Sequence, residues 1–286
     1  MARGVADRKT RKHRKDKPPC PYPGPNQWHP RGPIPANELR KIAEASGLSP
    51  STTSSTSLFN TLATHLGVDP SMKRSVVDAF PISNAEKTRL AAMYLRPPQP
   101  ESWKKDPDNW LDSNNIRDVM RQYEECMPSF KFLGPFPIDF AATDPYTKGE
   151  KKCLIDEMCD LDLDGKELEG KTHVGIVYNL DPHYKNGSHW VANYINIPKK
   201  TCYYFDSYGL PPPKEIHRFM QWLGLQEPDI KLGWNGRRFQ KMNSECGMYC
   251  LYFLSRMLEN ESFRAFCKCA PSDAFMLDLR DWMFST

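Results

Sequence analysis

Apolar residues recur at helical spacing along the first third of the chain. Three segments place them three and four residues apart, so that they share one face of a helix: 36–49, 58–68 and 82–95. In the third segment Ser83 or Asn84 is a good N-cap, Glu86 lies in the first turn, and the prolines of RPPQP end the helix. The pattern predicts a small helical region over residues 36–98.

Beyond residue 99 the pattern becomes that of a mixed domain. A helix predicted to begin at Asp112 or Ser113 is followed by three short runs rich in β-branched and aromatic residues, at 173–180, 189–197 and 202–208. Turn residues between these runs indicate neighbouring strands. Another helix is predicted over 213–224, and residues 246–258 are apolar on nearly every face, as in a buried central helix. We therefore predict an α+β domain over 99–286 with a central mixed sheet.

Composition sets residues 1–35 apart from the rest of the chain. Residues 1–17 have a net charge of +6, so the remainder carries −2 of the chain's total of +4, and eight prolines follow in residues 18–35. Such a composition extends the backbone and cannot bury a core, which predicts a disordered tail. The basic residues 3–17 either stay solvated or bind nucleic-acid phosphates without sequence preference.

The remaining composition bears on compartment and chemistry. No apolar run approaches the roughly 18 residues of a membrane span, and the N-terminus does not resemble a secretory signal. We expect no membrane span, no secretion, and a cytosolic or nuclear setting. The nine cysteines are odd in number and irregularly spaced, which favours reduced thiols over a disulfide framework. A cysteine is then free to act as a nucleophile.

Cys246 is the strongest nucleophile candidate. Taken alone, a cysteine in an apolar helix is more often a core residue. A thiol attacks a carbonyl as thiolate, however, and needs an imidazole or a helix N-terminus to lower its pKa of about 8.5. With Ser244 as the expected N-cap, Cys246 lies in the first turn of the buried helix, and Gly247 leaves room for a peptide substrate.

Three other residues complete the candidate site. His189 begins a predicted strand and Asp206 ends the next one, so adjacent strands bring the two side chains together at one rim of the sheet. The imidazole would act as base while the carboxylate fixes its tautomer. Gln240, six residues before Cys246, could donate its amide to the oxyanion together with the backbone N–H of Cys246.

Four motifs carry a resemblance to a known superfamily. The segments WLDSNNIRDVM, GSHWVANYINI, YYFDSYG and RRFQKMNSECGMYC, spread over roughly residues 100–286, resemble the SUMO proteases and the adenovirus endopeptidase. The sequence of these segments is most similar to that of the virion-maturation proteases of giant, mimivirus-like viruses and other large cytoplasmic DNA viruses. The African swine fever virus polyprotein protease is similar but more distant.

The resemblance implies a papain-like or adenain-like cysteine protease fold with a helical N-terminal extension. It implies an endopeptidase that cleaves viral capsid or core precursors, often after glycine or another small residue, during virion maturation. It assigns catalysis to His189, Asp206, Gln240 and Cys246, and makes Trp190 a flat wall beside the imidazole. It places the protein in the virion and the host cytoplasm, with no cofactor required and with a nucleic acid or a peptide as candidate activator.

Other chemistry-bearing residues compete less well. His173 and His183 are rival bases, Asp156 and Asp181 are rival acids, and Cys250 is a second thiol one turn along an apolar helix, where a core position is commoner. The run DLDLDGKELEGK begins like a calcium loop but has lysine at its twelfth position, so an acidic surface loop is the better interpretation. The pair in CKC lacks the spacing of a zinc site.

Three other functions remain open from the sequence. The same four residues suit an isopeptidase that removes a ubiquitin-like modifier, and a Cys-His-acid site also suits an acyltransferase. A non-catalytic nucleic-acid-binding or scaffold protein would instead use the basic tail and the helical region, whose first two helices faintly resemble a DNA-binding helical hairpin.

Overall fold

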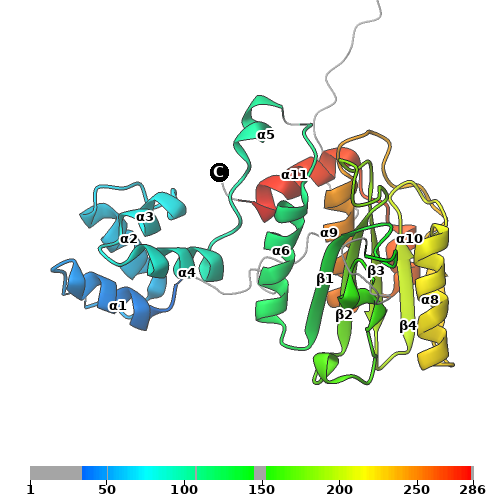
Figure 1. Ribbon diagram of the computed structural model, residues 1–286. Helices are drawn as coiled ribbons and strands as arrows, with labels where there is room; N and C mark the ends of the chain where they lie inside the picture. Colours follow the sequence, from blue (N-terminus) through cyan, green and yellow to red (C-terminus); the bar gives the residue numbers. More distant parts are fainter. Residues whose placement is uncertain (1–33, 50, 107, 145–152, 285–286) are drawn as a thin grey trace, which may run out of the picture.

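The computed structural model describes residues 34–49, 51–106, 108–144 and 153–284. The basic residues 3–17, and nearly all of the predicted tail, lie outside this range. A five-stranded sheet with helices on both faces lies beside a separate group of N-terminal helices (Figure 1). The predicted α+β class is confirmed.

The sheet is mixed and runs in the order β1-β2-β3-β4-β5. The central pairs β2/β3 and β3/β4 are antiparallel, while the edge strands β1 and β5 run parallel to β2 and β4. The strands are β1 (Phe130–Pro137), β2 (His173–Asn179), β3 (Trp190–Asn196), β4 (Thr201–Phe205) and β5 (Lys231–Trp234). The three inner strands are those predicted; β1 escapes prediction because two prolines and a glycine interrupt it, and β5 because it has only four residues.

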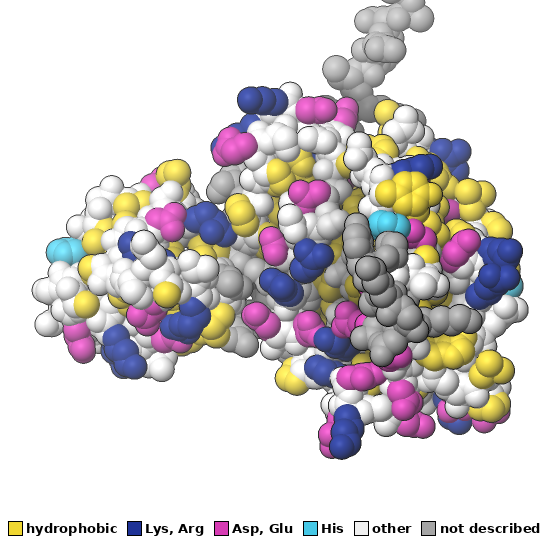
Figure 2. All heavy atoms as spheres, viewed as in Figure 1, with side chains coloured by type: hydrophobic (Ala, Val, Ile, Leu, Met, Phe, Trp, Pro, Cys, Tyr) yellow, Lys and Arg dark blue, Asp and Glu magenta, His cyan; other side chains and the backbone are white. Residues whose placement is uncertain are grey.

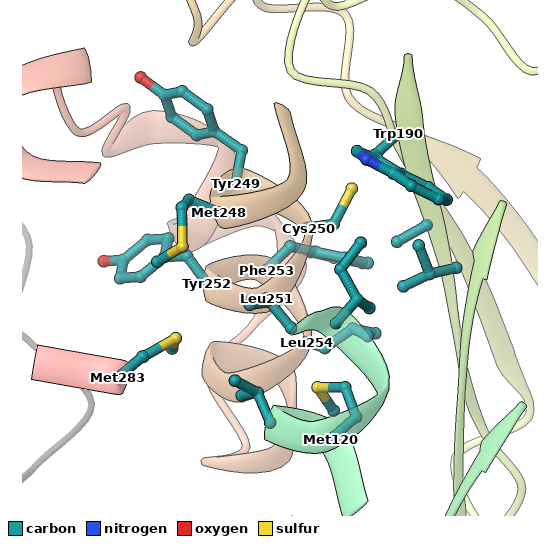
Figure 3. Packing of buried hydrophobic residues seen from close by; sticks show 14 of the residues in the cluster. Met120, Trp190, Met248, Tyr249, Cys250, Leu251, Tyr252, Phe253, Leu254 and Met283 are labelled. Atoms are coloured by element: carbon teal, nitrogen blue, oxygen red, sulfur yellow. The ribbon is translucent and has the colours of Figure 1, made fainter. Parts of the chain in front are cut away.

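Helices cover both faces of the sheet. Against one face lies α9 (Cys246–Leu258), all thirteen of whose residues are buried, as predicted for a central helix. Figure 3 shows its apolar side chains packed between the sheet and the neighbouring helices. Around it are α6 (Ser113–Cys126), α10 (Phe263–Lys268) and α11 (Asp273–Met283). The other face packs against α8 (Lys214–Gln226), α7 (Asp156–Cys159) and the short turn η1 (Lys166–Leu168).

The start of α6 is fixed by a reciprocal pair of hydrogen bonds. Asp112 is its N-cap: the carboxylate accepts from the N–H of Asn115 at 2.8 Å, and the Asn115 side chain accepts from the N–H of Asp112 at 3.0 Å. This capping box satisfies two helix-end donors and confirms Asp112 as cap. It also anchors the turn that carries Trp110 and Leu111, which reach the candidate site.

The N-terminal helices enclose a hydrophobic core of their own, drawn from residues 34–95. They are α1 (Ala36–Ala45), α2 (Ser55–His65), α3 (Lys73–Ala79) and α4 (Asn84–Tyr94), and the short α5 (Glu101–Lys105) follows. The α4 helix begins as predicted, with Ser83 accepting from the N–H of Glu86, whereas α3 was not predicted. Beyond the core, Arg96 donates to the carbonyl of Asp281 at 3.1 Å and Gln99 to its carboxylate at 2.9 Å, which joins the extension to α11.

The expectation of uniformly reduced cysteines is wrong in part. Cys153, which precedes α7, forms a disulfide with Cys159 at the end of this short helix, where their Cα atoms come within 6.4 Å, and Cys269 is also disulfide-bonded. Spacing alone does not reveal such a pair, because the turn between the two residues brings them together. Cys246 is free, as a nucleophile must be.

Charged side chains of both signs lie on the surface of the described residues. Figure 2 shows lysine and arginine side chains interspersed with aspartate and glutamate over the extension and the sheet domain on the face in view. None of the helices in the described ranges is long and apolar enough to cross a membrane.

Candidate active site

His189 and Asp206 meet at one rim of the sheet. His189 immediately precedes β3 and Asp206 immediately follows β4; because these strands are antiparallel neighbours, the start of one lies beside the end of the other. The imidazole Nε2 is 2.7 Å from Oδ1 of Asp206, and the two residues are only 9% and 1% exposed. The structure thus brings together the pair that strand order predicts.

Cys246 is the first residue of α9 and its thiol is hydrogen-bonded to the His189 imidazole. Because Nε2 is engaged with Asp206, Nδ1 is the nitrogen left for the thiol. The expected cap is wrong by one residue: Glu245, not Ser244, is the N-cap, and the Ser244 hydroxyl bonds to the Glu245 carboxylate instead. The positive end of the helix dipole still favours an anion at the first position.

The environment of His189 favours its charged form. Burial opposes protonation of the imidazole, but its hydrogen bonds to Asp206 and to Cys246 and their charges outweigh burial and raise its pKa to about 9. At neutral pH the imidazole is therefore protonated. An imidazolium beside a thiol at a helix N-terminus is the arrangement that stabilises a reactive thiolate.

The raised pKa of His189 sets a pH dependence. The protonated imidazole is the acid that a leaving amine requires, and this form predominates below the pKa and is lost as pH rises through about 9. We expect kcat/KM for a peptide substrate to show an alkaline limb near pH 9. In Asp206→Asn, which removes the carboxylate charge, this limb should move to lower pH. A limb unchanged in this variant would contradict the assignment.

Gln240 offers an unused donor. Its side chain is fully buried; the carbonyl Oε1 accepts a hydrogen bond from the Ser207 hydroxyl at 2.7 Å, whereas the amide Nε2 has no partner among the residues that the structure describes. A buried amide without a partner is costly in free energy, so such a group in a native protein calls for a functional explanation. Stabilising an oxyanion is the explanation that fits the predicted role.

Two further residues position the site and were missed in the sequence. Asn235, at the end of β5, accepts from the N–H of Asp206 at 2.9 Å and donates to its carbonyl at 2.6 Å. Ser207 orients Gln240, and its carbonyl accepts from the N–H of Gln240 at 2.9 Å. Ser207 is part of the FDSYG motif and could have been found from it. No local pattern indicates a role for Asn235, because its partner Asp206 is 29 residues away in the sequence.

Tyr208 forms a flat wall beside the imidazole: its ring stacks on His189 with centroids 4.7 Å apart. The role expected of Trp190 stays a prediction. The indole N–H of Trp190 donates to the carbonyl of Leu111 at 2.9 Å. A side chain at Gly247 would lie 3.0 Å from Cβ of Leu111 and 3.3 Å from Cδ1 of Trp190. A side chain at this position would therefore be tightly packed beside the nucleophile, and the binding of substrate by Gly247 stays a prediction.

A groove of about 460 Å³ adjoins this corner. One wall is the turn of Trp110, Leu111 and Asp112, and the other is the loop that precedes His189, including His183 and Lys185. Trp190 lies in its lining, and Trp110 is 42% exposed. Of the candidate-site residues, Trp190 alone is among those that line the groove.

The rival residues lie in other environments. His173 begins β2 and bonds to the Tyr194 hydroxyl at 2.7 Å, and His183 pairs with Asp139 at 2.7 Å. Cys250 is fully buried in α9 and burial raises the pKa of its thiol, as expected of a core residue (Figure 3). Within the described part of the chain, no group of three or more His, Cys, Asp or Glu side chains is placed to hold a metal ion.

A buried ion pair supports the turn before the nucleophile. Arg280 of α11 lies over the ring of Trp103 and pairs with Glu245 through two contacts, Nε–Oε2 at 2.9 Å and Nη2–Oε1 at 2.7 Å. Both side chains are at most 4% exposed. Removing one partner leaves a buried charge unpaired, which typically costs about 3–5 kcal/mol.

We expect Arg280→Met to lower the free energy of unfolding by about 3 kcal/mol or more in urea titrations. The double variant Glu245→Gln/Arg280→Met removes both charges and should recover most of this loss. Equal losses in the single and double variants would contradict a role for the unpaired charge.

Comparison with known proteins finds a matching family model and similar proteins. Residues 165–282 match the model of the Ulp1 protease family, C-terminal catalytic domain, a range that contains all four predicted catalytic residues. The chain is 32% identical over 159 residues to a putative thiol protease of Acanthamoeba polyphaga mimivirus, which covers 54% of this chain and 49% of that protein. It is 30% identical over 118 residues to an African swine fever virus protein named a SUMO-1 cysteine protease, with coverages of 38% and 43%. The chain thus spans about half the length, or less, of the curated relatives it matches.

The fold has a solved counterpart. The crystal structure of the African swine fever virus protease aligns over 88% of this chain and 89% of that one, with a TM-score of 0.54 and 18% identity. At this identity the likeness establishes the fold. The predicted resemblance to SUMO-protease-like enzymes and to their viral members is confirmed, and these matches support the prediction of a cysteine protease.

Proposed function

Since residues 165–282 match the catalytic domain of the Ulp1 protease family, we propose that this chain is a cysteine endopeptidase with Cys246 as its nucleophile. The observation that carries the proposal is the contact chain from the Cys246 thiol through the His189 imidazole to the Asp206 carboxylate. A non-catalytic scaffold would have no need to bury these three polar side chains in contact with one another.

The proposed reaction forms and hydrolyses a thioester. The Cys246 thiolate attacks the substrate carbonyl, and the oxyanion is held by the Gln240 amide and the backbone N–H of Cys246. The imidazolium of His189 gives its proton to the leaving amine and, as the neutral base, then activates the water that releases the acyl chain. Asp206 keeps the imidazole oriented through both steps.

We propose viral structural precursors, in the capsid or core, as substrates, cut after glycine or another small residue during virion maturation. The viral sources of the matched relatives support this choice. On this proposal the protein acts in the virion and the host cytoplasm and needs no cofactor. Residues 3–17 would bind nucleic acid. Either that nucleic acid or a peptide is a candidate activator.

Covalent labelling tests the proposal. A peptide vinyl sulfone with glycine at its reactive end should add once to the reduced protein, at Cys246, as read by intact mass and peptide mapping. The adduct should be absent in Cys246→Ala and form far more slowly in His189→Ala. Labelling spread over the other free cysteines, with DNA or virion extract present or absent, would contradict the proposal.

An isopeptidase is the second candidate, favoured by the name of the African swine fever virus relative and of the matched family. It would use the same residues on the bond between a modifier's terminal glycine and a lysine. Parallel digests of ubiquitin-like conjugates and of capsid or core precursors separate the two functions. Cleavage of conjugates alone would replace the first proposal with this one.

A further inference from the structure

The Tyr208 ring contacts both the imidazole of His189, the proposed base, and the guanidinium of Arg238. Its ring stacks on the His189 imidazole at an interplanar angle of 19° with centroids 4.7 Å apart, and the guanidinium carbon of Arg238 lies 5.0 Å from the centre of the same ring. The face of an aromatic ring carries negative charge and attracts cations. The imidazolium of His189 and the guanidinium of Arg238 are both such cations.

The backbone holds Tyr208 in this place. Its N–H donates to Oδ1 of Asp206 at 2.8 Å, the same oxygen that meets the imidazole. The next residue, Gly209, has φ +76°, and a Cβ there would come within 2.7 Å of the Arg237 carbonyl carbon. Only glycine allows this close approach between the two loops.

Arg238 joins this stack to the oxyanion side of the site. Its Nε donates to the carbonyl of Gln240 at 2.7 Å while its guanidinium lies over the Tyr208 ring. The N–H groups of Phe239 and Gln240 donate to the carbonyl of Ser207 at 2.8 and 2.9 Å. The segments 206–209 and 237–240 therefore form one hydrogen-bonded unit that contacts both the base and the predicted oxyanion donor.

We propose that Tyr208 is a positioning residue that holds the His189 imidazole in place and favours its protonated form, and that Arg238 keeps Tyr208 and Gln240 aligned. The inference rests on the proposed function for its catalytic meaning, but the effect on His189 exists without substrate. The ionisable groups facing the imidazole are the Asp206 carboxylate, the Cys246 thiol and Tyr208 itself, and Arg238 and Asp273 act on Tyr208 from its other surroundings. Burial raises the pKa of Tyr208, so its ring stays neutral in the working range.

The test is the titration of His189 in full-length protein labelled with ¹⁵N-histidine, followed by NMR from about pH 5 to about pH 10. In Tyr208→Leu the midpoint of His189 should fall by about half to one pH unit, because a cation–aromatic contact of ordinary strength is lost. In Tyr208→Phe, which keeps the ring, the midpoint should return to that of the wild type. With a peptide substrate, the alkaline limb of kcat/KM should move with the NMR midpoint while KM changes little.

Matched controls separate positioning from general damage. Tyr184→Leu removes a tyrosine that is 72% exposed and should leave the His189 midpoint in place. Tyr208→Met serves if the leucine variant unfolds, and Arg238→Met should lower kcat through Gln240. The proposal is overturned if the midpoint is the same in the wild type and the leucine variant, or if the phenylalanine variant behaves like leucine. If the protein proves to lack peptidase activity, the NMR midpoints still decide the role of Tyr208.

Discussion

Cys246→Ala is expected to lower kcat/KM for a peptide substrate by about 10⁴-fold or more, because no other group in the site can form the thioester. His189→Ala should cause a loss of similar size, since the thiol then lacks both its hydrogen-bond partner and the acid for the leaving amine. The measurement is steady-state cleavage of a fluorogenic peptide with glycine at the cleavage point.

A double variant, and a control variant at another free cysteine, test whether Cys246 and His189 act as one catalytic unit. Cys246→Ala/His189→Ala should be no slower than either single variant, because residues that act together give non-additive losses. Cys267→Ala removes a free, half-buried thiol on α10 and should keep nearly full activity. Full activity in Cys246→Ala would show that the nucleophile is another residue. Additive losses in the double variant would show that Cys246 and His189 do not act as one unit.

Gln240→Glu is expected to lower kcat by about 10²–10³-fold with little change in KM. The substitution keeps the shape of the side chain but replaces the unpaired Nε2 donor with an oxygen that cannot stabilise an oxyanion. Since the oxyanion develops only after attack, binding of the ground-state substrate should be nearly unaffected.

The control for this variant is Gln221→Glu, an identical chemical change at an exposed position of α8. It should match the wild type in kcat. A further variant, Ser207→Ala, removes the hydroxyl that fixes the Gln240 carbonyl and should cause a smaller loss. If Gln240→Glu raised KM with kcat unchanged, Gln240 would be a substrate-binding residue instead.

The spacing of apolar residues was sufficient to predict the elements that bury one distinct face or that are buried on every face. The inner strands and α9 carry an uninterrupted apolar or β-branched signal, and α4 and α6 carry side-chain caps, so their positions were predicted. The helices α10 and α11 were missed although Ser262 and Ser272 cap them. Other missed elements lack such a signal: β1 is interrupted by proline, and β5 and α3 have only four and seven residues. Pairing with longer neighbours in the folded chain, not local preference, stabilises them.

The sequence by itself determined the chemistry of the candidate site. Residue order along two adjacent antiparallel strands is enough to bring His189 to Asp206, and the start of an apolar helix is enough to give Cys246 its place. These are consequences of local patterns, in which strand alternation and helix period decide which ends of elements meet.

Only the tertiary structure decided what surrounds these residues. The stacking of Tyr208 on His189, the ion pair of Arg280 with Glu245 and the disulfide of Cys153 each depend on the three-dimensional approach of segments that carry no mutual signal. The unpaired amide of Gln240 likewise becomes visible only when burial and every neighbouring donor and acceptor are known. Contacts between loops follow from how the whole chain packs, because loop conformation is not set by a repeating pattern of apolar positions.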